Sequence, residues 1–297
     1  MIPSEDVPTE PITIVPEPRP YPEPNTAKRT RKALLWSLVV GSIVLSSSGA
    51  ALADTSRVVG AMPVGNQSKW TQYFADDFTT DVSLGGFPSS AYRSSWFPYV
   101  AGSRDTSGYG TYNAAKTLSV DNSILRAKLF SERGTNYVNA MIAMKTWGHT
   151  YGKYEIRLRV PKPIPGYKVV PLLWPDSNDW HEGEVDFPEV HNLTHNDTIR
   201  AAIFPGGDPV NPDSWDYRHS TVSIIGEQWH TYGIEWLPNS LTFTIDGVPQ
   251  GTAVTGVPDT PMHLVLQYET AIDRGPPPAA SAGVIEVDWV TAYKPIW

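Results

Sequence analysis

Three carboxylates stand within six residues at positions 184–189, which read EVDFPE. On a β-strand, successive side chains point to opposite faces, so Glu184 and Asp186 would share one face. Strict alternation would send Glu189 to the other side. One extra residue, a β-bulge, would return Glu189 to the face of the other acids, and Pro188 is tolerated where a ladder is interrupted. We therefore predict three acids on one surface with an apolar surface behind them.

Crowded carboxylates oppose folding because they repel one another and raise one another's pKa. Chemistry that needs one ionised and one protonated carboxyl explains this cluster better than a solvated acidic face on an edge strand. In retaining glycoside hydrolysis, one carboxylate attacks the sugar while a second serves as acid and then as base. Glu184 and Glu189 are the candidates for this pair. Asp186 would hydrogen-bond the nucleophile and keep charge on the strand, which would help to hold Glu189 protonated.

Tryptophans flank the acids and are candidates for sugar binding. Trp174 precedes the acids, and Trp180 lies four residues ahead of Glu184. Aromatic rings offer flat apolar faces that suit stacking on sugar rings, so we predict that both line the substrate cleft. Trp236 and Trp289 lie in alternating apolar segments, and we predict that they belong to the core.

Two polar side chains, His191 and Gln267, complete the predicted substrate-binding set. His191 and His195 are four residues apart, a spacing that suits metal ligands on a helix, but we expect this segment to be a loop. We therefore predict no catalytic metal. The chain has no Cys and no G-x-S-x-G sequence, which argues against a thiol nucleophile and a serine-hydrolase elbow.

The acids match a family signature, E-x-D-x-x-E, at the right spacing, with a Gly directly before it and a Trp shortly upstream. A later segment, WHTYGIEW at 229–236, is followed by IDGV at 245–248 and looks like a core strand and its hairpin. On these residues the chain resembles glycoside hydrolase family 16, specifically its bulged, laminarinase-like branch. The resemblance covers roughly residues 72–295.

This resemblance implies a β-sandwich jelly roll, concanavalin-like, with a concave substrate cleft and retaining attack on a β-glycosidic bond. It assigns Glu184 as nucleophile, Asp186 as its helper and Glu189 as acid/base. The reaction requires no cofactor, although members often carry a structural calcium ion, for which Asp288 is a candidate ligand. Two departures bear on the substrate. Residues 201–206 read AAIFPG where laminarinases usually have a His and an aromatic before a Gly, and the upstream Trp is one residue closer to the acids.

Apolar and polar residues alternate in several segments of the chain, which predicts half-buried strands. The clearest are residues 154–160, 241–245, 262–268 and 284–290, and a tight turn at Asp246 and Gly247 closes the second. We find no convincing long amphipathic helix after residue 54. Many short strands between Gly, Pro, Asn and Asp turns predict an all-β sandwich.

The N-terminal part of the chain predicts targeting out of the cytoplasm rather than a folded domain. Residues 1–24 hold eight of the 28 prolines and are expected to be disordered. Basic residues, an apolar run and an A-x-A ending then describe a signal peptide cleaved after Ala53, although this run is also long enough for a membrane anchor. We divide the chain into a disordered, Pro-rich, cytoplasmic-side leader with a basic end (1–32), a signal-peptide hydrophobic region or anchor (33–53), a linker (54–71) and a catalytic domain (72–297).

The formal net charge of −8 argues against nucleic acid as a partner and suits a neutral polysaccharide. We predict a monomeric, retaining endo-β-glycanase that hydrolyses β-1,3- or mixed-linkage glucan, is secreted or held in the cell envelope, and meets a membrane only if the leader is uncleaved. One alternative is a non-catalytic glycan-binding protein on the same fold, which would need neither catalytic Glu. Another is a cell-wall transglycosylase, which would use the same carboxylates, so the sequence does not separate it from a hydrolase.

Overall fold

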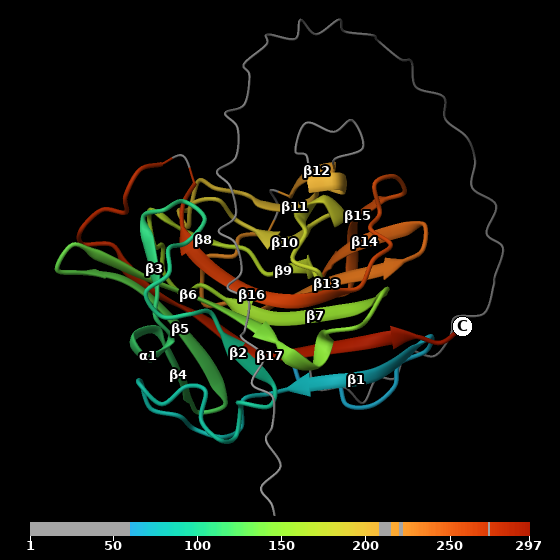
Figure 1. Ribbon diagram of the computed structural model, residues 1–297, viewed down its shortest axis with the longest axis horizontal. Coiled ribbons are helices and arrows are strands. Elements are labelled where there is room, and N and C mark those ends of the chain that lie inside the picture. Colours follow the sequence, from blue (N-terminus) through green and yellow to red (C-terminus); the bar gives the residue numbers. More distant parts are fainter. Residues whose placement is uncertain (1–59, 208–214, 220–221, 273) are drawn as a thin grey trace, which may run out of the picture.

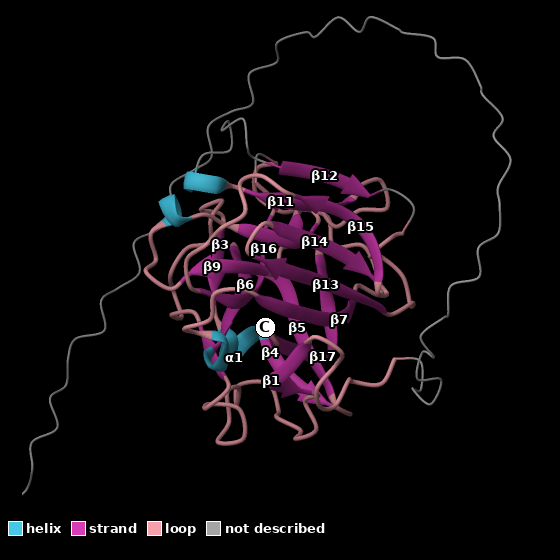
Figure 2. Cartoon of the chain, turned by 90° about the vertical axis from the view of Figure 1, so that its right-hand side faces the viewer, coloured by secondary structure: helices cyan, strands magenta, loops and turns pink. Residues whose placement is uncertain are grey.

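The computed structural model describes residues 60–207, 215–219, 222–272 and 274–297. Over these ranges the chain forms two packed β-sheets with short helical turns, as Figures 1 and 2 show. The segments interpreted as leader (1–32) and as signal peptide or anchor (33–53) lie outside the described residues. Within the described ranges, no helix is long and apolar enough to cross a membrane.

Sheet A has the strand order β15, β14, β13, β7 and β17, and the other edge of β17 is shared by β5 and β1. Its strands are β1 (Trp70–Asp76), β3 (Gly110–Tyr112), β4 (Leu118–Asp121), β5 (Ile124–Glu132), β7 (Gly152–Arg159), β13 (His230–Leu237), β14 (Ser240–Ile245), β15 (Val248–Ala253) and β17 (Ala282–Pro295). All these pairings are antiparallel except that of β3, which runs parallel to β6.

Sheet B has the order β12, β11, β10, β9, β16, β6 and β2, with β8 pairing with β16 beyond the end of β9. Its strands are β2 (Trp96–Pro98), β6 (Thr135–Ala143), β8 (Tyr167–Val169), β9 (Leu172–Pro175), β10 (Val185–Glu189), β11 (Ile199–Ile203), β12 (Trp215–His219) and β16 (Met262–Thr270). Strand β6 joins the sheets, because it pairs with β5 in sheet A and with β16 in sheet B. The architecture is the predicted jelly-roll sandwich.

The helical elements of the described residues are all short and lie in connections. They are α1 (Ala114–Thr117) and the 3-10 turns η1 (Met144–Thr146), η2 (Trp180–Glu182) and η3 (Pro205–Gly207), the last interrupted by Gly206 at φ 66. The absence of a long helix after residue 54 is therefore confirmed for the described ranges. Turn η2 directly precedes the acidic strand, and η1 lies between β6 and β7.

The four segments with clear alternation form strands β7, β14, β16 and β17. Strands β14, β16 and β17 extend beyond their predicted ranges, because ladder pairing continues where the hydrophobic alternation ends, whereas β7 begins two residues early and ends one residue short, at Arg159. The turn after β14 contains Asp246 at φ 51 and Gly247 at φ 77, so both residues take the left-handed backbone that a tight hairpin turn requires.

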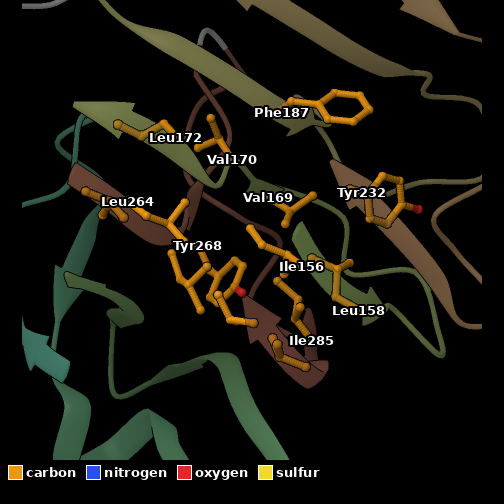
Figure 3. Close-up of a cluster of buried hydrophobic side chains, with 14 of the residues drawn as sticks. Ile156, Leu158, Val169, Val170, Leu172, Phe187, Tyr232, Leu264, Tyr268 and Ile285 are labelled. Carbon is orange, nitrogen blue, oxygen red and sulfur yellow. The ribbon is translucent and has the colours of Figure 1, made fainter. Parts of the chain in front are cut away.

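The main core lies between the two sheets. Figure 3 shows part of it, with Ile156 and Tyr232 from sheet A and Phe187 and Tyr268 from sheet B. Trp236 is fully buried and donates its Nε1 hydrogen to the carbonyl of Pro258. Trp289 is 4% exposed, so both predicted core tryptophans are buried.

The folded unit begins earlier than the predicted boundary at residue 72. The carbonyl of Gly60 accepts a hydrogen bond of 2.9 Å from Trp289 Nε1. Gln67 donates to the hydroxyl of Tyr293, and β1 itself starts at Trp70. The second half of the segment interpreted as a linker is therefore packed on sheet A, because backbone carbonyls and polar side chains there complete hydrogen bonds of β17.

Candidate active site

The predicted bulge is present in β10. Asp186 lies opposite Ala202 of β11 and Glu189 lies opposite Arg200, so three steps on β10 face two steps on its neighbour. The extra residue restores the alternation that would otherwise turn Glu189 away. Glu184 immediately precedes the strand, and its carbonyl accepts a hydrogen bond from Phe204 N. The three acids therefore come to one face of sheet B, which we call the cleft face.

The opposite face of β10 is anchored in the core, as predicted. Val185 is fully buried, and the ring of Phe187 lies 5.8 Å from the ring of Tyr232 and 5.2 Å from that of Phe243, both in sheet A. Packing on the far side fixes the strand, so the acids do not depend on their own contacts for their position.

Glu184 is buried and receives a directed hydrogen bond. Trp180, from turn η2, donates its Nε1 hydrogen to Glu184 Oε2 at 2.6 Å. Burial, together with the negative charge of Glu189, raises the pKa of Glu184 to about 7, although the bonds from Trp180 and Asp186 act in the opposite direction. Trp180 is thus in contact with the candidate nucleophile and only partly buried, rather than a core residue.

Asp186 differs from expectation in its charge. It is 1% exposed, and burial followed by the charges of Glu184 and Glu189 raises its pKa well above the ordinary value. This shift opposes the prediction that Asp186 keeps negative charge on the strand, because three buried acids do not all ionise in a small volume. If it is neutral, Asp186 would donate its proton to Glu184, the neighbour whose charge and hydrogen bond contribute to its raised pKa. Its helper role thus rests on donation rather than on charge.

Glu189 has a different set of neighbours. His191 Nε2 lies 2.8 Å from Glu189 Oε1, and His191 Nδ1 lies 2.9 Å from a guanidinium nitrogen of Arg200. Arginine only donates, so Nδ1 accepts and Nε2 carries the hydrogen that His191 donates to Glu189. Burial would raise the pKa of Glu189, but this hydrogen bond and the positive charges of Lys168 and Arg200 together lower it. His191, predicted to bind substrate, contacts the catalytic candidate Glu189, and its side chain stays 39% exposed.

The strand register places the remaining candidates on the cleft face. Leu172 of β9 lies opposite Asp186, so Trp174, two residues further on, shares that face. His263 of β16 lies opposite Trp174, and Gln267 lies on the same side four residues along β16. Trp174 is partly buried and donates its Nε1 hydrogen to Asn178. Trp174 and Gln267 thus lie on the face where substrate binding was predicted.

A buried ion pair in sheet B was not predicted. Lys168 Nζ lies 2.9 Å from Glu269 Oε2, and the side chains are 5% and 0% exposed. Tyr112 donates to the other oxygen of Glu269. Burial would lower the pKa of Lys168, but the charge and hydrogen bond of Glu269, and the charge of Glu189, raise it, so the ammonium is retained beside the three acids. The available signal was a Lys inside the otherwise apolar segment 167–170 and a Glu directly after the largely apolar segment 264–268.

The segment that departs from laminarinases lies along the acids. Ala202 places only a methyl group opposite Asp186, and Phe204 follows at the level of Glu184. Two surface hollows lie elsewhere, one lined by residues 222–230 and the other by residues of the 87–115 region, and neither is lined by an acid of β10. The strand register, rather than the hollows, locates the site.

The surroundings of Asp288 do not fit a calcium ion. Asp288 Oδ2 forms an ion pair of 2.9 Å with Arg157 Nε, and a bound cation would have to displace that guanidinium. Calcium takes six to eight oxygen ligands, often from several acids. In the part of the chain that the structure describes, no three His, Cys, Asp or Glu side chains are grouped so that they could hold a metal.

Comparison with known proteins agrees with this geometry. The model of the family "Glycosyl hydrolases family 16" matches residues 105–291. A β-glucanase of Acetivibrio thermocellus is 26% identical over 121 residues, which cover 39% of this chain and 33% of that protein. The aligned part is thus about a third of the length of this relative.

Two solved structures share the fold at identities below 20%. An endo-1,3-β-glucanase from Streptomyces sioyaensis superposes with a TM-score of 0.63 at 19% identity, covering 78% of this chain and 99% of that one. Rv0315 of Mycobacterium tuberculosis, described as an immunostimulatory antigen and pseudo β-1,3-glucanase, superposes with a TM-score of 0.59 at 18% identity, covering 75% and 98%. With the match over most of its folded residues, this chain belongs to glycosyl hydrolase family 16.

Proposed function

We propose that this protein is a secreted, retaining endo-β-glycanase that hydrolyses β-1,3- or mixed-linkage glucan through a glycosyl-enzyme intermediate. The observation that carries the proposal is the bulge in β10, which brings Glu184 and Glu189 to one face with Asp186 between them. Two carboxyl groups on one face are what a double displacement requires. Proteins with this fold include both glucanases and a pseudo-glucanase, so the fold alone does not establish catalysis and the proposal depends on these side chains.

In this proposal Glu184 attacks the anomeric carbon. Trp180 N–H donates to Oε2 of its carboxylate and a protonated Asp186 would donate to the same carboxylate, which orients the group for attack on the sugar. As the glycosyl-enzyme forms, the negative charge on Glu184 disappears. The two hydrogen bonds therefore stabilise the leaving carboxylate again in the second step, when water attacks the anomeric carbon.

Glu189 would protonate the departing glycosidic oxygen and then deprotonate the attacking water. In the free protein the directions of the pKa shifts favour the proton on Glu184 rather than on Glu189. The reaction therefore needs the proton to move to Glu189 when substrate enters. We infer that the sugar displaces His191 from Glu189, because the hydrogen bond from His191 is the largest of the contacts that lower the pKa of Glu189. Without that bond, the raising effect of burial on the pKa of Glu189 is opposed mainly by the charges of Lys168 and Arg200.

The glycosidic linkage of the substrate and the secretion of the protein are inferred from charge, relatives and the N-terminal sequence. The formal charge of −8 disfavours polyanionic substrates, and proteins that share the fold or part of the sequence are named β-glucanases. The basic and apolar residues before residue 54 support secretion. The protein would act as a monomer and without a cofactor, since the two carboxyls and water supply the chemistry.

The test is product analysis on laminarin, mixed-linkage β-glucan and agarose, with proton NMR following the anomers as they form. A retaining endo-enzyme releases oligosaccharides whose new reducing ends are initially β. Initial α-anomers would contradict retention. Chain-lengthened products without release of reducing ends would favour the transglycosylase. Binding without any turnover, in protein with intact fold, would favour the glycan-binding alternative.

A further inference from the structure

Trp147 is an aromatic side chain that the proposed mechanism does not use. It follows turn η1 in the connection between β6 and β7, and it is 37% exposed. Its ring lies on the ring of His263, with centroids 4.2 Å apart and planes 8° from parallel. One face of the indole is therefore covered by an imidazole, and the exposed part of the ring belongs to the other face and the edges.

The base of this stack is rigid. His263 belongs to β16 and is 1% exposed, and its Nδ1 lies 2.9 Å from Asp176 Oδ1. Burial lowers the pKa of His263 despite the charge of Asp176, so the ring is neutral and Nδ1–H donates to the carboxylate. The hydrogen bond fixes the plane of the imidazole, and with it the plane of Trp147.

The backbone on both sides of Trp147 is also tied down. The hydroxyl of Thr146 accepts a hydrogen bond of 2.8 Å from Leu264 N. Gly148 N donates to Asp176 Oδ2 at 2.6 Å, and the carbonyl of His149 accepts from Met262 N at 3.1 Å. Asp176 thus holds both the imidazole and the loop. A ring fixed in this way loses little conformational entropy when a ligand stacks on it.

The stack lies on the cleft face at the level of the candidate nucleophile. His263 lies opposite Trp174, and Trp174 lies at the level of Glu184, because Leu172 and Leu173 are opposite Asp186 and Val185. Strand β16 is two places from β10, a separation of about 10 Å at the usual spacing between strands. The stack of Trp147 on His263 therefore lies beside Trp174, on the side away from β10.

We propose that Trp147, held flat on His263, is a further sugar-binding platform that stacks on a pyranose ring of a β-linked glucan away from the bond that is cleaved. This inference rests on the proposed function and specifies the length of chain that the cleft recognises. A Trp with a purely structural role would usually be buried, whereas Trp147 is stacked on His263 and remains 37% exposed. The apolar face of a sugar ring suits the uncovered side.

The test measures binding of β-1,3-glucan oligosaccharides, from the disaccharide to the hexasaccharide, by calorimetry. All proteins carry Glu184→Gln so that the ligands stay intact. The variants are Trp147→Ala, Trp147→Leu and Trp147→Tyr. The control is Trp297→Ala, which removes an indole that is 81% exposed at the C-terminus, beyond sheet A.

Trp147→Ala and Trp147→Leu should weaken binding of the longer oligosaccharides by about five- to tenfold and that of the disaccharide much less. Trp147→Tyr, which keeps a flat ring, should retain most of the affinity, and Trp297→Ala should bind like its parent. A loss that is equal at all lengths, or a Leu variant that binds like its parent, would overturn the platform. If the wild-type chain neither binds nor cleaves any β-glucan, the proposed function fails as well. If the wild type cleaves β-glucan and the Trp147 variants bind oligosaccharides like their parent, only the platform proposal is wrong.

Discussion

On the outer face of sheet A, charges of opposite sign meet across neighbouring strands, whereas on the cleft face of sheet B acids of the same sign meet on one strand. Glu286 of β17 is bonded to Arg159 at 2.7 Å and to Arg126 on its other side. Around β10, by contrast, burial followed by the charges of Glu184 and Glu189 raises the pKa of Asp186, and the nearby ammonium of Lys168 is already paired with Glu269. Sheet A arranges its charges for stability. In sheet B, the three neighbouring acids repel one another at the site where the proposed chemistry needs them.

The largest expected difference is between the same substitution, Glu to Gln, made once in each sheet. Glu184→Gln should lower turnover of β-glucan by on the order of 10⁴-fold or more, because an amide does not form the glycosyl-enzyme. Glu286→Gln should leave turnover near the wild-type value but lower the free energy of unfolding by about 1–3 kcal/mol, because two arginines lose a buried charged partner. Steady-state rates and urea unfolding measure both. Comparable losses of activity in the two variants would erase the contrast.

The next effect concerns Glu189. Glu189→Gln should lower turnover of glucan by about 10²–10⁴-fold, since the leaving group then departs without a proton. An activated aryl glycoside needs no proton on departure, so it should still form the glycosyl-enzyme and then stall. Azide needs no general base and should restore turnover. The product should be the β-configured glycosyl azide, identified by NMR, whereas an α-azide would indicate inversion.

The smallest effect is a pH dependence of stability that sheet B should have and that Glu184→Gln should reduce. Burial raises the pKa of Glu184 from 4.5 to about 7, so the folded protein holds this proton more tightly than the unfolded chain does. The stabilisation is complete below pH 4.5 and is lost as the pH rises through 7. Relative to Glu184→Gln, the wild type should therefore lose up to about 3 kcal/mol of unfolding free energy over this window. Urea unfolding of both proteins at several pH values across this window measures the difference. If the difference in unfolding free energy between the two proteins stays constant with pH, the prediction is wrong.

Local patterns predicted most of the fold and the arrangement of the acids. The strand at 154–160 and the turn at Asp246 follow from alternation and from backbone preference, which depend on neighbouring residues only. The bulge followed from the spacing of the acids and from Pro188. These features need no knowledge of which strands pair.

What the sequence did not reveal depends on contacts between distant segments. Lys168 and Glu269 are about a hundred residues apart, and only the pairing of β8 with β16 makes them an ion pair. The raised pKa of Asp186 depends on burial, which alternation does not measure. His191 was predicted to bind substrate, but Arg200, from the neighbouring strand, orients it toward Glu189. The early start of the folded unit depends on Trp289 reaching Gly60.

Trapping of the intermediate tests the central claim most directly. A 2-deoxy-2-fluoro glucoside with a good leaving group slows the second step, so the sugar should accumulate on the nucleophile. Digestion and mass spectrometry of the labelled protein then locate it. We predict one sugar attached to Glu184 of the wild type. The Glu184→Gln variant, treated in the same way, should carry no label. A label on Glu189 or Asp186 would contradict the assignment, and turnover of glucan by the wild type without any trapped sugar would contradict the double displacement itself.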